Sequence, residues 1–139
     1  MGLAQSLARL LAVSLLALGL GQTAQAKDLV TDIAVLQALD KTTARITTLQ
    51  ALVGQPVHFG SLEVVVRTCR KHPPEEEPES AAFLDIWDTK PNQPAQEVFR
   101  GWMFASSPAV SAMEHPVYDI WVLDCLSSSE GETGKSSGN

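Results

Sequence analysis

The chain has few cysteines and few basic residues, and each of these shortages excludes some classes of protein. Its 139 residues include two Cys, one Tyr and 10 Lys or Arg against 16 Asp or Glu, which gives a formal net charge of -6 at pH 7. An acidic protein repels nucleic-acid phosphates and anionic lipid surfaces. We therefore set aside nucleic-acid binding and peripheral membrane adsorption.

The first 26 residues predict a cleaved secretory signal peptide. They carry one basic residue, Arg9, followed by an apolar run over residues 10–20 and by the small-x-small sequence Ala24-Gln25-Ala26. The apolar run is shorter than the about 20 residues of a membrane-spanning helix, so we expect cleavage after Ala26 and not a retained anchor. No Cys follows the run, which disfavours a lipoprotein. The prediction is a secreted, periplasmic protein without a transmembrane anchor in its mature form.

The two cysteines predict one structural disulfide, Cys69–Cys125, because exported proteins fold in an oxidising compartment. The alternative is a pair of free thiols for redox or metal chemistry, but the chain has no C-x-x-C spacing. Strict alternation along residues 62–70 places Cys69 on the same face as Glu63 and Arg67. We therefore expect the disulfide at a sheet end or edge and not in the deepest core.

Alternating and β-branched residues predict an all-β fold of six or seven short strands. The clearest strand is residues 62–70, and residues 34–52 read as a hairpin with a turn at 41–44. Further strands are expected at residues 57–59, 81–88, 97–105 and 117–126. Short strands in this number predict a small single-domain β-sandwich or partly open barrel, stapled by one disulfide and carrying one short helix.

The segments between these strands and at the two ends have other compositions. The segment Lys71–Ser80, which we call the acidic loop, is rich in Pro and Glu. Its composition predicts a solvated connector, with a cation-binding or partner-docking loop as the alternative. Ser106 or Ser107 can cap a short helix that starts at Pro108 and ends before Pro116. The predicted β domain spans residues 34–126, with a flexible N-terminus at 27–33 and a disordered tail at 127–139.

No catalytic constellation stands out in the sequence. Ser106 or Ser107, His115 and Asp119 follow one order of an acyl-transfer triad, but the serines lack the flanking glycines of a nucleophile elbow. The three histidines are too widely separated to predict a metal site, and the carboxylate pairs 85/88 and 119/124 are expected on opposite strand faces. We assign no catalytic residue, metal or cofactor and expect a protein that is not an enzyme.

The aromatic side chains suggest either a core or a recognition surface. A domain of this size needs several large rings to build one core. The alternative is a binding surface formed by partly exposed Trp102 and Trp121 beside Met103 and Met113, with His115 nearby. This surface is the best functional lead in the sequence.

Three segments carry a resemblance to a known family. They are F-G-S-L-E-V-V-V-R-T-C at 59–69, P-P-E-E-E-P-E-S-A-A-F-L-D-I at 73–86 and G-W-M-F-A-S-S-P-A-V-S-A-M-E-H-P-V-Y-D-I-W-V-L-D-C at 101–125. Over roughly residues 34–125 the chain resembles the exported bacterial proteins known as domain of unknown function 2155. The resemblance implies a periplasmic protein of Gram-negative bacteria with no assigned activity and no catalytic residues to carry over.

These observations lead to two functional expectations. The first is a non-catalytic interaction module of unknown specific role that contacts an envelope protein or a cell-wall component through the Trp102 surface and the acidic loop. The second is a small-ligand or saccharide-binding domain that uses exposed Trp102 or Trp121 for stacking. A hydrolase comes third, and the oligomeric state is left open.

Overall fold

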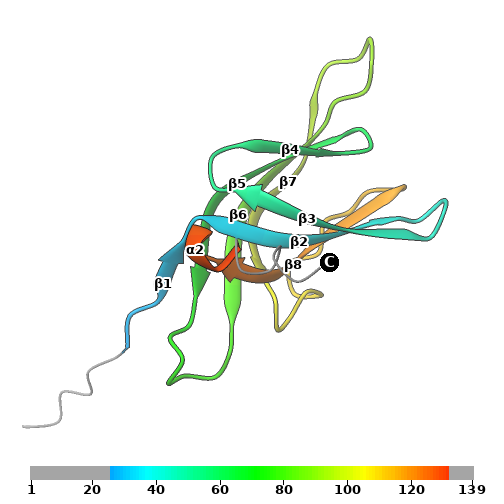
Figure 1. Cartoon of the computed structure of the whole chain (residues 1–139). Coiled ribbons are helices and arrows are strands. Elements are labelled where there is room, and N and C mark those ends of the chain that lie inside the picture. Colours follow the sequence, from blue (N-terminus) through cyan, green and yellow to red (C-terminus); the bar gives the residue numbers. More distant parts are fainter. Residues whose placement is uncertain (1–25, 132–139) are drawn as a thin grey trace, which may run out of the picture.

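The computed structural model describes residues 26–131, which form two antiparallel β-sheets (Figure 1). The predicted signal peptide therefore lies outside the described residues, apart from Ala26. Five of the eight strands belong to one sheet and three to the other, and one helical turn follows the last strand. The all-β prediction is confirmed.

The first sheet, which we call sheet A, is built around β5 (Leu62–Lys71) and β6 (Ser80–Asp88). β6 pairs with β7 (Gln96–Phe104) on its far side. The other edge of β5 is shared by two short strands, β1 (Leu29–Thr31) near its end and β4 (Pro56–Phe59) near its start. The acidic loop after β5 is thus the connection of a β5–β6 hairpin.

The second sheet, sheet B, has the strand order β3-β2-β8. β2 (Ile33–Asp40) and β3 (Arg45–Leu52) form the predicted hairpin, whose turn is stabilised by the Asp40 carboxylate accepting the backbone N–H groups of Thr42 and Thr43. β8 (Tyr118–Leu126) pairs with the other edge of β2. The chain passes between the sheets at Asp32, at the turn after β3 and in the segment between β7 and β8.

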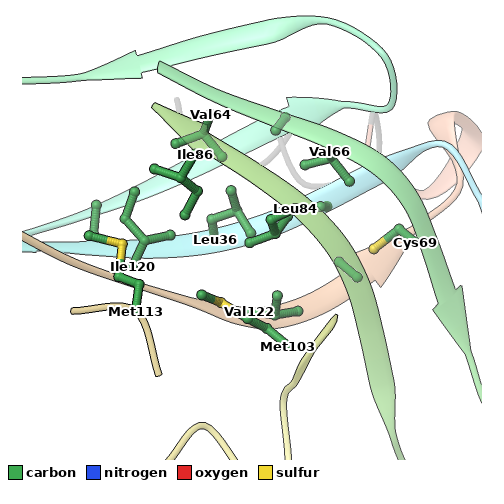
Figure 2. Close-up of a cluster of buried hydrophobic side chains, with 14 of the residues drawn as sticks. Leu36, Val64, Val66, Cys69, Leu84, Ile86, Met103, Met113, Ile120 and Val122 are labelled. Atoms are coloured by element: carbon green, nitrogen blue, oxygen red, sulfur yellow. The ribbon is translucent and has the colours of Figure 1, made fainter. Parts of the chain in front are cut away.

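The two sheets enclose a single apolar core (Figure 2). Sheet A contributes its alternating side chains from β5 and β6, and sheet B contributes those of β2 and β8. The largest fully buried side chains are Leu36, Leu62, Val64, Val66, Cys69, Leu84, Ile86, Val122 and Cys125. Burial of this aliphatic set is the main stabilising term for the fold.

The disulfide is formed as predicted, but its location corrects the expectation of an edge position. Cys69 on β5 and Cys125 on β8 are both fully buried, and their Cα atoms lie 5.7 Å apart. The bond therefore joins sheet A to sheet B through the core.

Two β-bulges explain why both cysteines face the core and why the alternation expected for Cys69 was wrong. The β5 register shifts between Val66 and Thr68, and the β8 register shifts where Val35 and Leu36 of β2 face Asp124 and Val122. The extra residues are Arg67 and Leu123, each two positions before a cysteine. A bulge reverses the alternation of side chains beyond it, so both cysteines turn inward.

The short helix predicted to start at Pro108 does not form. Residues 105–106 and 108–111 are turns, held by two backbone hydrogen bonds in which Ser107 donates to Phe104 and Val110 donates to Ser107. The stretch between Pro108 and Pro116 is too short to repay helix nucleation. The predicted cap is absent as well, because the Ser106 hydroxyl instead donates to the Glu79 carboxylate.

Both segments predicted to flank the domain contain regular structure. Within the expected flexible N-terminus, Leu29–Thr31 pairs with β5 as β1. Within the expected disordered tail, Ser128–Gly131 forms the helical turn α2, where the Ser128 N–H donates to the Asp32 carboxylate at 2.8 Å. Backbone pairing in one case and a side-chain acceptor in the other supply order that composition does not reveal.

Candidate functional site

The candidate site is a hollow of about 280 Å³ on the outer face of sheet A. A cross-strand row forms its floor, because Arg70 of β5 faces Ala81 of β6, and Ala81 faces Phe104 of β7. Trp102 stands one row further along β7. The remaining lining comes from the start of the described chain and from the acidic loop: Asp28, His72 and Glu79.

The centre of the hollow is a stack between Arg70 and Trp102. The Arg70 guanidinium carbon lies 5.9 Å from the centroid of the indole ring, within the range of a cation–π interaction. Phe83 supports the indole from the side, with the two rings edge to face at a centroid distance of 5.7 Å. The bulge at Arg67 has a second effect here, since the same reversal that buries Cys69 turns Arg70 outward onto Trp102.

The acidic loop forms one wall of the hollow and is held in place by Glu79. The Glu79 carboxylate accepts hydrogen bonds from the Ser80 N–H at 2.9 Å, the Ser106 N–H at 3.1 Å and the Ser106 hydroxyl. Partial burial alone would raise the pKa of Glu79, but these bonds outweigh it and lower the pKa below its ordinary value. The loop is therefore tied to the end of β7 and is more than a solvated connector.

His72 anchors the other end of the acidic loop. Its Nδ1 lies 2.8 Å from the Glu77 carbonyl oxygen, to which a protonated Nδ1 donates. That hydrogen bond, together with the nearby carboxylates of Asp28, Glu76 and Glu79, raises the pKa of His72. The Asp28 carboxylate lies 3.9 Å from its Nε2.

Arg70 is the charged group of the hollow that has no partner of opposite sign among residues 26–131. Glu79 is satisfied by Ser80 and Ser106, and Asp28 faces His72. Arg70 contacts the Trp102 ring, and its guanidinium N–H groups form no ion pair in the described part of the chain. A guanidinium that contacts an aromatic face can still present its N–H groups to a carboxylate.

The other residues of the predicted binding surface are not part of this hollow. Met103 and Met113 are 2% and 5% exposed and belong to the core (Figure 2), and His115 is also buried. Trp121 faces outward from β8, and it lines a second hollow of about 210 Å³ between β8 and the segment that precedes it, together with Met113. The structure therefore does not bring the five predicted residues together, and Trp102 alone lies in the candidate site.

The order of residues that suggested an acyl-transfer triad is not realised in space. Ser106 is bound to Glu79, and Asp119 forms an ion pair with Lys41 at 3.1 Å. His115 is paired with Asp88, its Nε2 lying 3.2 Å from the carboxylate. Each of the three residues therefore has a different partner.

His115 has a structural environment that occupies both of its ring nitrogens. The backbone N–H groups of Val117 and Tyr118 both donate to Nδ1 at 3.1 Å, so the ring proton is on Nε2 and is donated to Asp88. The ring also stacks on Tyr118 at a centroid distance of 5.3 Å. No ring nitrogen is left to accept a proton from a substrate.

The Asp88 carboxylate is held ionised within this arrangement. Burial alone would raise its pKa, but interactions with Ser61, His115 and Lys90 outweigh that effect and lower the pKa of Asp88 to about 2. Lys90 lies 3.0 Å from the carboxylate. The pair therefore fixes the end of β6 to the segment before β8.

The second carboxylate of the 85/88 pair lies on the other face of β6, as the alternation predicts. Asp85 is 4% exposed and faces outward between two arginines, with Arg67 Nε at 2.6 Å and Arg100 Nε at 2.8 Å. Burial alone would raise the pKa of Asp85, but the two guanidinium groups lower it. The two carboxylates do not flank a common space.

Among residues 26–131 no group of three or more His, Cys, Asp or Glu side chains is arranged to hold a metal ion. Within the same residues no helix is long and apolar enough to cross a membrane. The three histidines each have a separate neighbour, since His58 lies 3.2 Å from Glu63 while the other two are bonded as described.

The fold and the hollow define a small two-sheet β domain with one buried inter-sheet disulfide and an arginine–tryptophan site on an outer face. The family model described as "Uncharacterized protein conserved in bacteria (DUF2155)" matches residues 34–125, so the chain belongs to this family. An uncharacterized protein of Rickettsia prowazekii (strain Madrid E) is 30% identical over 89 residues, which are 64% of this chain. The match covers 57% of that relative's length. No solved structure matches the chain.

Sequence reasoning missed Arg70, His72 and Glu79 as parts of the site. Arg70 was missed because the bulge at Arg67 turns it outward, and no local sequence pattern predicts that bulge. For the other two a signal existed, because the resemblance included the acidic loop, and a loop that belongs to a recognisable pattern is more than a spacer.

Proposed function

We propose that this protein is an exported, non-catalytic interaction domain of the bacterial envelope, and that its contact site is the Arg70–Trp102 hollow. The observation that carries the proposal is the Arg70 guanidinium, which lies over the Trp102 ring and has no partner of opposite sign among residues 26–131, in a concave site lined by Trp102 and Phe104. Tryptophan and arginine are the residues most enriched among the side chains that dominate protein–protein binding energies.

The chemistry of the hollow favours a protein segment that presents a carboxylate beside an apolar side chain. The carboxylate would pair with the exposed edge of Arg70, and the apolar group would contact Trp102 and Phe104. The neighbouring carboxylates of Asp28 and Glu79 already have partners and repel further negative charge. The hollow therefore favours a ligand with one anionic group and disfavours a second. The separate partners of Ser106, His115 and Asp119 support a non-catalytic role.

The test is crosslinking of the tagged full chain in intact cells, with identification of the attached protein. The variants Trp102→Ala and Arg70→Ala should lose the adduct. Trp87→Ala is the matched control, because Trp87 is a half-buried tryptophan on the same outer face that does not line the hollow. An adduct that survives Trp102→Ala and Arg70→Ala would refute this contact site.

Export has its own measurement. The mass of the chain recovered from the periplasmic fraction should correspond to a mature protein that begins at Lys27. A chain that stays in the cytoplasmic fraction with its N-terminal segment intact would contradict the signal-peptide prediction.

The second candidate is a saccharide or another small ligand at the same hollow. Its size, about 280 Å³, is close to the lower limit for small-molecule sites. However, Arg70 already covers part of one face of the indole, which a sugar ring would need for stacking. A Trp102-dependent fluorescence change with wall fragments or sugars, together with no protein adduct in cells, would favour this candidate.

A further inference from the structure

β3 forms a free edge of sheet B, above β2 in Figure 1, with β8 on the other side of β2. Its eight residues pair with β2 from Arg45 to Leu52 without a register shift. The strand contains no proline and no glycine. Its outer edge is therefore a long, regular row of backbone groups without a strand partner among residues 26–131.

The other edge strands described in the structure all carry features that hinder further pairing. β1 has three residues, and β4 has four and begins with Pro56. β7 has a register shift across Val98, and β8 has one across Leu123. Short length, proline and bulges are the usual protections of sheet edges. β3 has none of them.

The charge of β3 also differs from that of the rest of the chain. Although the protein is acidic, no Asp or Glu occurs between Lys41 and Leu62, and Arg45 is the single charged residue of the strand. A strand from a second, acidic copy that pairs with this edge therefore meets no negative side chain of β3. The long-range repulsion expected between two copies of an acidic protein is weakest here.

The side chains of β3 are arranged symmetrically about Leu49. Ile46, Thr48, Gln50 and Leu52 are exposed on the outer face, and Thr47, Leu49 and Ala51 face the core side. In an antiparallel pair, directly opposed residues point to the same face. A pairing of β3 with itself that keeps the faces matched must therefore be centred on a residue, and Leu49 is the centre that pairs all the residues from Ile46 to Leu52.

We propose that β3 pairs antiparallel with β3 of a second copy of this chain, with Leu49 opposite Leu49. This register puts Ile46, 56% exposed, opposite Leu52, 45% exposed, at both ends of the pairing. Two exposed apolar side chains thus become a cross-strand pair, which occurs twice because the interface is isologous. The two three-stranded B sheets become one sheet of six strands.

The same register keeps the charges apart. Arg45 lies opposite Val53 of the other copy, so the two Arg45 side chains are separated by eight residues, or about 26 Å along the strands. This separation exceeds the screening length of about 8 Å at physiological ionic strength. Any other residue at the centre loses both Ile46–Leu52 contacts, because Ile46 lies opposite Leu52 only when Leu49 is the centre.

The test is the concentration dependence of mass, measured by sedimentation equilibrium on the full chain purified under oxidising conditions. The unmodified chain should shift from monomer to dimer as its concentration rises into the range of tens of micromolar. Ile46→Lys with Leu52→Lys places two lysines opposite each other at both ends. It should weaken association at least tenfold.

Two further variants test the register and the specificity of that effect. Ile46→Glu with Leu52→Lys places a glutamate opposite a lysine at both ends, so it should still dimerise, with an affinity that falls as salt is added. Leu29→Lys with Val110→Lys adds the same two positive charges at exposed apolar positions outside β3 and should leave the dimer unchanged.

Each outcome bears on the proposal. A chain that remains monomeric throughout overturns it, and a dimer that persists in the two-lysine variant shows that another surface associates. A dimer weakened equally by the lysine pair and the glutamate–lysine pair refutes the Leu49-centred register. The inference does not rest on the proposed function, because Trp102→Ala should leave dimerisation intact.

Discussion

Removal of the Cys69–Cys125 disulfide should lower the free energy of unfolding by about 4 kcal/mol. The two cysteines are separated by 56 positions, and closing a loop of that length removes this much conformational entropy from the unfolded chain on the chain-entropy model. Both residues are fully buried, so substitution by alanine also removes core contacts, which adds to the loss. A domain of ordinary stability, about 5–15 kcal/mol, would lose a large share of it.

The measurement is urea unfolding of the full chain, followed by tryptophan fluorescence, with and without reductant. Cys69→Ala with Cys125→Ala should match the reduced protein to within about 1 kcal/mol, because both lack the same cross-link. Either single substitution should be at least as destabilising as the double one, since it leaves a lone thiol in the core. A loss below about 1 kcal/mol in the double variant would refute the argument that this bond supports the docking of the two sheets.

Three further predictions concern individual contacts. Acidification should destabilise the protein by up to about 2 kcal/mol through Asp88, because the pKa of this carboxyl, about 2, lies below its ordinary value of 3.8. The stabilisation is complete above pH 3.8 and is lost as the pH falls through 2. Asp88→Asn should flatten this part of the profile of stability against pH. Gly60→Ala should cost about 2–4 kcal/mol in thermal unfolding, because Gly60 has a φ of 58° and an added Cβ would overlap the Tyr118 phenol. Gly54→Ala is its control, with a φ of 83° and open space around it, and should cost about 1 kcal/mol. Asp85→Ala should cost about 1–3 kcal/mol in urea unfolding because it leaves Arg67 and Arg100 without their carboxylate, and an unchanged midpoint would contradict a stabilising role for this cluster.

Much of the fold could be predicted from period-2 patterns and turn residues. The hairpin of β2 and β3, the strand from Leu62 and the loops rich in proline were found because β-branched residues alternate there and proline interrupts the ladders. The disulfide followed from the number of cysteines in a chain with a predicted export signal. These features depend on local sequence, which is why they could be predicted.

The positions of side chains beyond each bulge could not be predicted. Alternation counted from Leu62 places Cys69 outward and Arg70 inward, and the observed arrangement is the reverse. A bulge is decided by how one strand pairs with its neighbour, and the sequence of one strand does not contain that information. The error removed Arg70 from the predicted site and moved the disulfide away from the core.

The predicted surface failed for a related reason. Met103 is next to Trp102 on β7, and neighbouring residues of a strand point to opposite faces. Met113 and His115 lie in the segment before β8, where both are buried. Sequence proximity thus grouped two core methionines with two tryptophans that lie on the outer faces of different sheets. The pairing of His115 with Asp88 spans 27 positions and needed the fold to become visible.

The disulfide also makes the folding of this protein measurable by chemistry. Its two sulfur atoms belong to strands of different sheets and meet only where those sheets are packed together. Formation of the native disulfide therefore shows that the two sheets have docked. A reductant can break the bond only in molecules whose sheets have separated. The rate at which a small thiol reduces the folded protein reports how often the two halves of the core part.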